Sequence, residues 1–173
     1  MERNSDVSRI VSEETIRNVC GDRPIPDLGV IEQIWDRDPI PLSRIESRAA
    51  AAVESLSFDH VPAGGEIAIG VGSRGIANLE TIVRGVVDGV RELSYEPFIF
   101  PAMGSHGGAT SAGQREVLES YGVSESSIGC EIRATMDVVQ VGKTPDRDVP
   151  VYVDANAADA DGILPINRVK PHT

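Results

Sequence analysis

The sequence contains little cysteine, no long apolar run and no excess of positive charge. Its two cysteines, Cys20 and Cys130, lie far apart and belong to no CxxC pattern, so we expect two reduced thiols. No apolar run reaches the roughly 18 residues that a membrane span needs. Residues 1–6 lack the basic-then-apolar form of a secretory signal. We therefore expect a cytoplasmic protein without a membrane partner.

Acidic residues outnumber basic ones by 27 to 16, which gives the 173-residue chain a formal net charge of −11. A field of that sign repels phosphate backbones, so it disfavours general nucleic-acid binding. A local basic site stays open, because Arg74, Arg168 and Lys170 lie near glycine or proline in predicted loops.

The length and the polarity pattern indicate one α/β domain with an amino-terminal arm. Residues 1–29 are polar, and the prolines within 23–27 exclude a helix interior there. A short helix is expected at 12–16, with Ser12 as its cap. Residues 30–173 form the expected domain, which is long enough to bury a core without disulfides or metals.

Alternating strand and helix patterns predict a mostly parallel sheet. The expected strands of the sheet are residues 30–35, 66–71, 97–101 and 162–166. A helix predicted for 78–93 joins the second and third of these strands, and such a βαβ unit needs parallel strands. Residues 136–153 predict a small hairpin. We expect a three-layer, Rossmann-like α/β fold with helices on both faces of the sheet.

Two glycine-rich loops follow neighbouring strands of this predicted sheet. The first, residues 72–75, contains Arg74, and the second, residues 104–108, contains His106 among glycines. The carboxyl ends of parallel strands share one edge, where ligands of α/β proteins bind. We expect Arg74 and His106 to face one crevice, where a guanidinium suits an anion and an imidazole suits proton transfer.

A second histidine follows another predicted buried strand. His172 and Lys170 lie in residues 167–173, directly after the strand predicted at 162–166. A natural domain is not expected to end within such a loop. We expect a chain truncated at its carboxyl end, which would then supply only part of a site.

Three segments together resemble the amino-terminal domain of the lactate racemase family, the nickel-pincer-cofactor-dependent isomerases. The segments are GSRGIAN at 72–78, AMGSHGGAT at 102–110 and NRVKPHT at 167–173. The resemblance covers the chain from about residue 20 to its end. It implies a two-domain α/β enzyme that racemises or epimerises a 2-hydroxy acid. It also implies hydride transfer to a nickel pincer nucleotide while a histidine removes the hydroxyl proton.

The family pattern implies roles for particular residues. By position, His106 and His172 match the acid/base pair, one for each enantiomer, and Arg74 matches the arginine that binds the substrate carboxylate. The residues implied for cofactor binding are Ser73, Gly104 and Lys170. No metal ligand is expected in this chain, because the covalent lysine and the nickel-binding histidine of the family lie beyond the His172 position.

These implications set expectations about partners and about activity. The fragment alone is expected to be inactive and to need a missing carboxyl-terminal part or second domain, while a homo-oligomer stays open. In lactate racemase an acidic residue lies three positions before the arginine, and here that position is Val71. The particular hydroxy acid therefore stays open.

Two other interpretations compete with the enzyme. The crevice of Arg74 and His106 also suits a noncatalytic α/β module that binds an anionic ligand or a partner chain. Gly70, Gly72 and Gly75 give the spacing of a dinucleotide fingerprint. However, the acidic residue about 20 positions on begins a strand rather than ending one. Ser73 and Ser105 show no paired base at a defined spacing, so nucleophilic catalysis is not indicated.

Overall fold

The computed structural model describes residues 12–21, 29, 32, 38–73 and 75–168. The chain divides into two compact units, Met1–Asp38 and Pro39–Thr173. The strand predicted for 30–35 lies almost wholly outside the described residues, and the boundary predicted between 29 and 30 stays a prediction. Among the described residues, no helix is both long and apolar enough to cross a membrane.

The first unit contains one described helix, α1 (Glu13–Cys20). The backbone N–H of Thr15 donates to the Ser12 hydroxyl at 3.2 Å, which satisfies one of the donors that a helix start leaves without a partner. The predicted cap is therefore confirmed. Gly21 follows the helix with a φ of 68°, a conformation that glycine adopts without steric cost.

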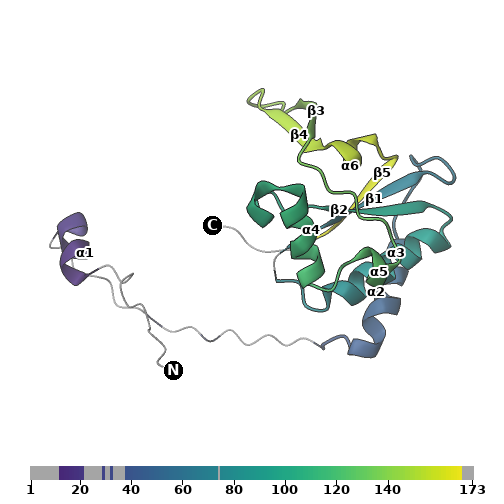
Figure 1. The fold of residues 1–173 in the computed structure, drawn as a ribbon, viewed down its shortest axis with the longest axis horizontal. Helices are drawn as coiled ribbons and strands as arrows, with labels where there is room; N and C mark the ends of the chain where they lie inside the picture. The colour runs from purple at the N-terminus through teal and green to yellow at the C-terminus, as the bar shows by residue number, and fades with distance from the viewer. Residues whose placement is uncertain (1–11, 22–28, 30–31, 33–37, 74, 169–173) are drawn as a thin grey trace. The chain divides into compact units, whose positions relative to one another are not determined.

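The second unit is built on a three-stranded parallel sheet. Its strands are β1 (Glu66–Val71), β2 (Glu96–Pro101) and β5 (Gly162–Ile166), in the order β2-β1-β5. Helix α3 (Leu79–Glu92) lies between β1 and β2 in the sequence, and these two strands pair in parallel. The predicted parallel βαβ unit is thus confirmed (Figure 1).

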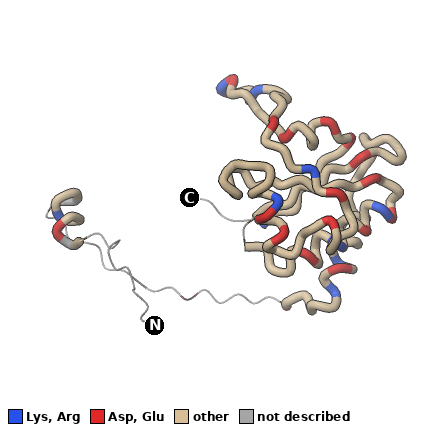
Figure 2. The backbone as a smooth tube through the Cα atoms, in the orientation of Figure 1, with Lys and Arg blue, Asp and Glu red and all other residues tan. Residues whose placement is uncertain are grey.

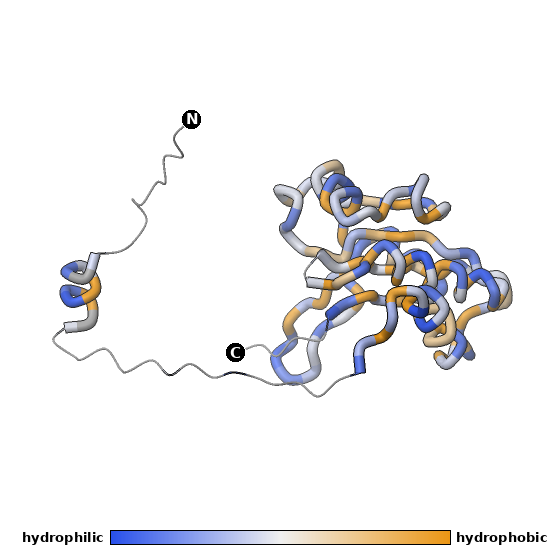
Figure 3. The backbone as a smooth tube through the Cα atoms, turned by 90° about the horizontal axis from the view of Figure 1, so that it is seen from below, coloured by the Kyte–Doolittle hydropathy of each residue, from blue (hydrophilic) through white to orange (hydrophobic). Residues whose placement is uncertain are grey.

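Apolar side chains pack on both faces of this sheet because neighbouring residues of a strand point to opposite sides. Ile67 and Ile69 of β1 belong to the larger core cluster, with the buried side of α3. Ala68 lies in a smaller cluster with Phe98 and with Ala157 of α6 (Ala155–Asp159). Figure 3 shows apolar stretches through the interior of the unit and hydrophilic ones in its outer loops. The fold is therefore a mixed α/β fold.

Two glycines let α3 lie close to α2 (Ile45–Glu54), which follows a 3₁₀ turn, η1 (Leu42–Arg44). A Cβ atom at Gly85 would lie 2.3 Å from the backbone oxygen of Glu46. One at Gly89 would lie 3.0 Å from the backbone oxygen of Ala50. Backbones can approach this closely only where no side chain intervenes, so the spacing of these glycines sets the helix contact.

Further elements complete the second unit. They are η2 (Gly107–Ala109), α4 (Ser111–Ser120), α5 (Glu125–Ile128), β3 (Val138–Lys143) and β4 (Pro150–Asp154). Strands β3 and β4 pair antiparallel, which confirms the predicted hairpin. At its turn Lys143 binds Asp148 at 2.8 Å. Figure 2 shows acidic residues spread over many parts of this unit.

The segment after α5 runs along the outer edge of β2. The backbone N–H of Ile99 donates to Glu131, and that of Arg133 donates to Ile99, each at 2.8 Å. The Arg133 guanidinium lies 4.0 Å from the centre of the Phe98 ring and binds Glu66 at 2.8 Å. Its hydrogen bond lowers the pKa of Glu66. These contacts cover an edge that would otherwise expose unpaired backbone groups.

The contact between α2 and α3 predicts a graded response to added methyl groups. Gly85→Ala should lower the free energy of unfolding by about 1 kcal/mol or more, because pressing Cβ against backbone costs more than the gain in helix propensity. Gly89→Ala should cost less, and Gly142→Ala, where a Cβ meets nothing within 4 Å, serves as the control. Urea denaturation measures all three. Equal stabilities of the three variants would contradict the close approach.

Burial predicts that Cys130 is unreactive in the folded protein. The thiol is 4% exposed, and burial raises its pKa to about 11. Since the thiolate is the reactive form, iodoacetamide at pH 8 should modify Cys130 only after denaturation, as peptide mass spectrometry can measure. The unfolded state loses this proton at a lower pH, so stability should fall as pH rises above about 9. Rapid modification under native conditions would contradict the described packing.

Candidate functional site

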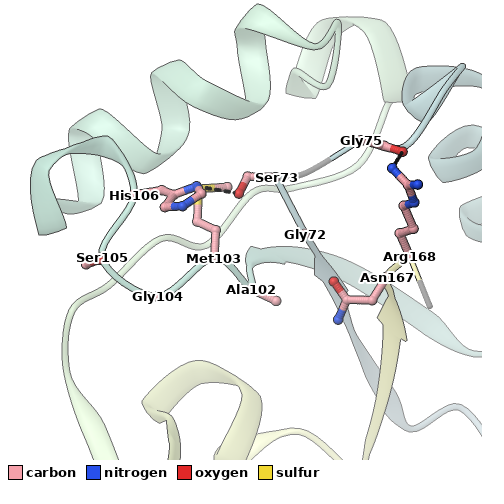
Figure 4. Close-up of a pocket in the computed structure, with 10 residues that line it drawn as sticks. All are labelled: Gly72, Ser73, Gly75, Ala102, Met103, Gly104, Ser105, His106, Asn167 and Arg168. Atoms are coloured by element: carbon pink, nitrogen blue, oxygen red, sulfur yellow. Dashed lines mark hydrogen bonds between the residues drawn. The ribbon is translucent and has the colours of Figure 1, made fainter. Parts of the chain in front are cut away.

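Three loops meet at the carboxyl edge of the sheet. Val71 pairs with Pro101 of β2 and with Ile166 of β5, so the three strands end level with one another. The loops line an open pocket of about 700 Å³, which is within the range of small-molecule sites. Its lining, drawn in Figure 4, is Gly72, Ser73, Gly75, Ala102, Met103, Gly104, Ser105, His106, Asn167 and Arg168.

A hydrogen bond joins the first two loops across the pocket. The Ser73 hydroxyl lies 2.6 Å from Nδ1 of His106 (Figure 4). Ser73 is only 8% exposed, and it follows the last buried residue of β1 by two positions. The predicted proximity of the two glycine-rich loops is confirmed. The sequence showed no base paired with Ser73 at a defined spacing, and the fold brings His106 to it from 33 positions away.

The loop of His106 is held against the start of α4. A Cβ at Gly107 would lie 2.3 Å from the backbone carbon of Gly113, so the two segments are in close backbone contact. Gly107 has a φ of 64°, a region that side chains disfavour. The Gln114 side chain, 3% exposed, donates from Nε2 to the Gly104 oxygen at 2.7 Å. These contacts fix the backbone on both sides of His106.

The first and third loops touch at Gly72 and Asn167. The Gly72 N–H donates to the Ile166 oxygen at 3.1 Å. A Cβ on Gly72 would lie 2.1 Å from Oδ1 of Asn167. The absence of a side chain at Gly72 therefore gives Asn167 its place in the pocket wall.

Arg168 brings positive charge to the pocket. Its NH1 atom lies 3.5 Å from the Gly75 oxygen, and the residues that line the pocket within the described chain include no aspartate or glutamate. A guanidinium in a described lining without acidic groups favours a carboxylate or phosphate ligand.

The structure brings some of the predicted site residues together. Ser73, Gly104 and His106 all line the pocket. Arg74, Lys170 and His172 lie outside the described residues. Sequence reasoning missed Asn167 and Gln114, and gave Arg168 no role beyond local charge. Asn167 and Arg168 directly follow a predicted buried strand, and this signal was sufficient to place them at the same edge; no comparable signal marks Gln114.

The buried amide of Gln114 predicts a stability effect centred on the His106 loop. Gln114→Ala should cost about 1–3 kcal/mol, because the Gly104 oxygen loses its buried donor. Amide hydrogen exchange in residues 104–109 should accelerate. Glu116→Ala, an exposed change on the same helix, is the control. Lower stability with unchanged exchange in this loop would show that Gln114 acts by packing alone.

The chain was compared with family models, curated proteins and solved structures. No family model, curated protein or solved structure matches the chain. The resemblance to the lactate racemase family therefore stays a prediction from three sequence segments.

Proposed function

We propose that this chain is the amino-terminal part of a racemase or epimerase that acts on a 2-hydroxy acid, with His106 as a proton-transfer residue. The observation that carries the proposal is the imidazole of His106 in a pocket at the carboxyl edge of a parallel sheet, with Nδ1 against Ser73. Histidine is the side chain whose ordinary pKa best suits proton transfer near neutral pH.

Substrate recognition in this proposal depends on Arg168. A 2-hydroxy acid carries its carboxylate next to the carbon that changes configuration. A guanidinium holds a carboxylate through two parallel hydrogen bonds and so fixes that carbon relative to His106. Arg74, which the family resemblance assigns to the carboxylate, would share this role.

Inversion of configuration needs proton transfer on two sides of the substrate. His106 takes or returns the hydroxyl proton on one side. His172, which lies outside the described residues, is proposed for the other side. Since the reaction runs in both directions, each histidine acts as base for one enantiomer and as acid for its mirror image.

The described lining suits the anionic groups of a pincer nucleotide and includes no ligand set for nickel. Arg168 and the Ser73 hydroxyl are of the kind that binds phosphate or carboxylate. Within the described chain, no group of three or more His, Cys, Asp or Glu is placed to hold a metal ion. Acceptance of the α-hydride is the chemistry that the bound nucleotide would supply. Lys170 and Gly104 stay proposed contacts to it.

The proposed enzyme would have a layered architecture and would need a further part of the protein. The apolar clusters on both faces of the sheet support a three-layer, Rossmann-like arrangement. A second domain or carboxyl-terminal part would supply the remaining cofactor contacts. We also propose a cytoplasmic location, and a homo-oligomer stays open.

A noncatalytic anion-binding module is the second candidate. The observation that favours it is the described pocket itself, which combines Arg168 with a single histidine, His106, and no acidic residue. Binding without stereochemical inversion is what distinguishes this candidate from the enzyme.

Substitution of Arg168 and His106 separates binding from chemistry. Arg168→Ala should weaken binding of a short 2-hydroxy acid to the 173-residue chain by about tenfold, since it removes a charge-assisted hydrogen bond. Arg147→Ala in the hairpin turn is the control. His106→Gln should retain binding yet abolish interconversion of enantiomers by the complete protein loaded with nickel cofactor. Calorimetry measures the binding, and chiral chromatography measures the interconversion.

The outcomes distinguish the enzyme from the noncatalytic binding module. Undiminished racemisation by His106→Gln overturns the proton-transfer role. Tight, Arg168-dependent anion binding by a complete protein that never interconverts enantiomers favours the binding module. Equal binding by Arg168→Ala and the unaltered chain removes the carboxylate role of Arg168 from both candidates.

A further inference from the structure

Ser73 makes a contact that the family resemblance does not assign to it. We infer that Ser73 is the positioning residue of His106: its hydroxyl oxygen accepts a hydrogen bond from Nδ1–H, so that Nε2 is the nitrogen that exchanges the substrate proton. The inference rests on the proposed function, because only a proton-transfer histidine needs one particular nitrogen directed to the substrate.

The geometry holds both partners of this hydrogen bond in place. Ser73 is 8% exposed and lies one residue after Gly72, whose N–H is bound to β5. On the other side, Met103 is 8% exposed and Gln114 holds the Gly104 oxygen. The 2.6 Å contact therefore joins two anchored segments (Figure 4). A bond of this kind loses less conformational entropy than one between mobile surface side chains.

The contact also selects a protonation pattern. A neutral imidazole has one N–H, and a base that accepts a proton at Nε2 must carry its own proton on Nδ1. The Ser73 oxygen can accept that Nδ1–H both before and after Nε2 is protonated. Proton transfer at Nε2 then leaves the bond to Ser73 unchanged, which suits a reaction that runs in both directions.

A hydroxyl partner suits this pocket better than a carboxylate would. Carboxylates commonly orient histidines, but they add negative charge beside the ring. The described lining contains no acidic residue and includes Arg168. Ser73 thus orients the imidazole without repelling an anionic substrate.

The opposite relationship, in which His106 activates Ser73 as a nucleophile, uses the same pair of atoms. A nucleophilic serine must present its oxygen to the substrate. Ser73 is instead largely buried. The positioning role therefore accounts for more of the geometry.

Nitrogen NMR of the histidine rings tests the inference without any turnover. In the free chain labelled with ¹⁵N-histidine, the ring shifts give the ratio of the two neutral tautomers, with His106→Asn for assignment and His60, in an exposed loop, as reference. His106 should favour the Nδ1–H tautomer more than His60 does. Ser73→Ala should reduce this preference by about fivefold, as expected for one lost hydrogen bond. Ser73→Thr, which keeps the hydroxyl, should retain it.

The control is Ser105→Ala, a change to another pocket serine, which should leave the His106 shifts unaltered; circular dichroism confirms that each variant folds. A His106 tautomer ratio equal to that of His60, or unchanged by Ser73→Ala, overturns the inference. Labelling of Ser73 by a fluorophosphonate also overturns it, in favour of the nucleophile. These results are independent of racemisation, so failure of the positioning role is distinguishable from failure of the proposed function.

Discussion

The parallel pairing of β1 on both of its sides is the constraint on which the site depends. Because β2 and β5 run in the same direction as β1 and end level with it, three loops leave the sheet at one edge. The apolar residues of β1 are buried in clusters on both faces of the sheet. This burial fixes both the position of the strand between the two faces and its register with the neighbouring strands. A shift of one residue would turn these side chains to the wrong faces, so the position of Ser73 is determined by the core.

The pocket differs electrostatically from the rest of the chain. The net charge of −11 opposes the approach of an anion, whereas the described pocket lining carries Arg168 and no carboxylate. Charges farther away than about 8–10 Å are largely screened at physiological ionic strength. Charge in the described lining therefore acts on a ligand more strongly than the distant acidic surface, which mainly affects solubility and the rate of encounter.

Much of the fold could be predicted from the sequence because its signals are local. The apolar run at 66–71 and the helical stripe that follows it predict a parallel βαβ unit, and the structure confirms it. The contacts that shape the site are not local. The pairing of Ser73 with His106 and the support of Gly104 by Gln114 depend on distances that no periodicity encodes. The role of the α3 glycines in the helix contact is likewise apparent only from the structure, where α2 packs against them.

The meeting of Gly72 with Asn167 constrains how this pocket can diversify. A side chain at position 72 would occupy the place of the Asn167 amide oxygen. Any residue larger than glycine at this position therefore requires the Asn167 side chain to move out of the pocket wall. A change at position 72 would in this way alter the pocket lining at two places at once.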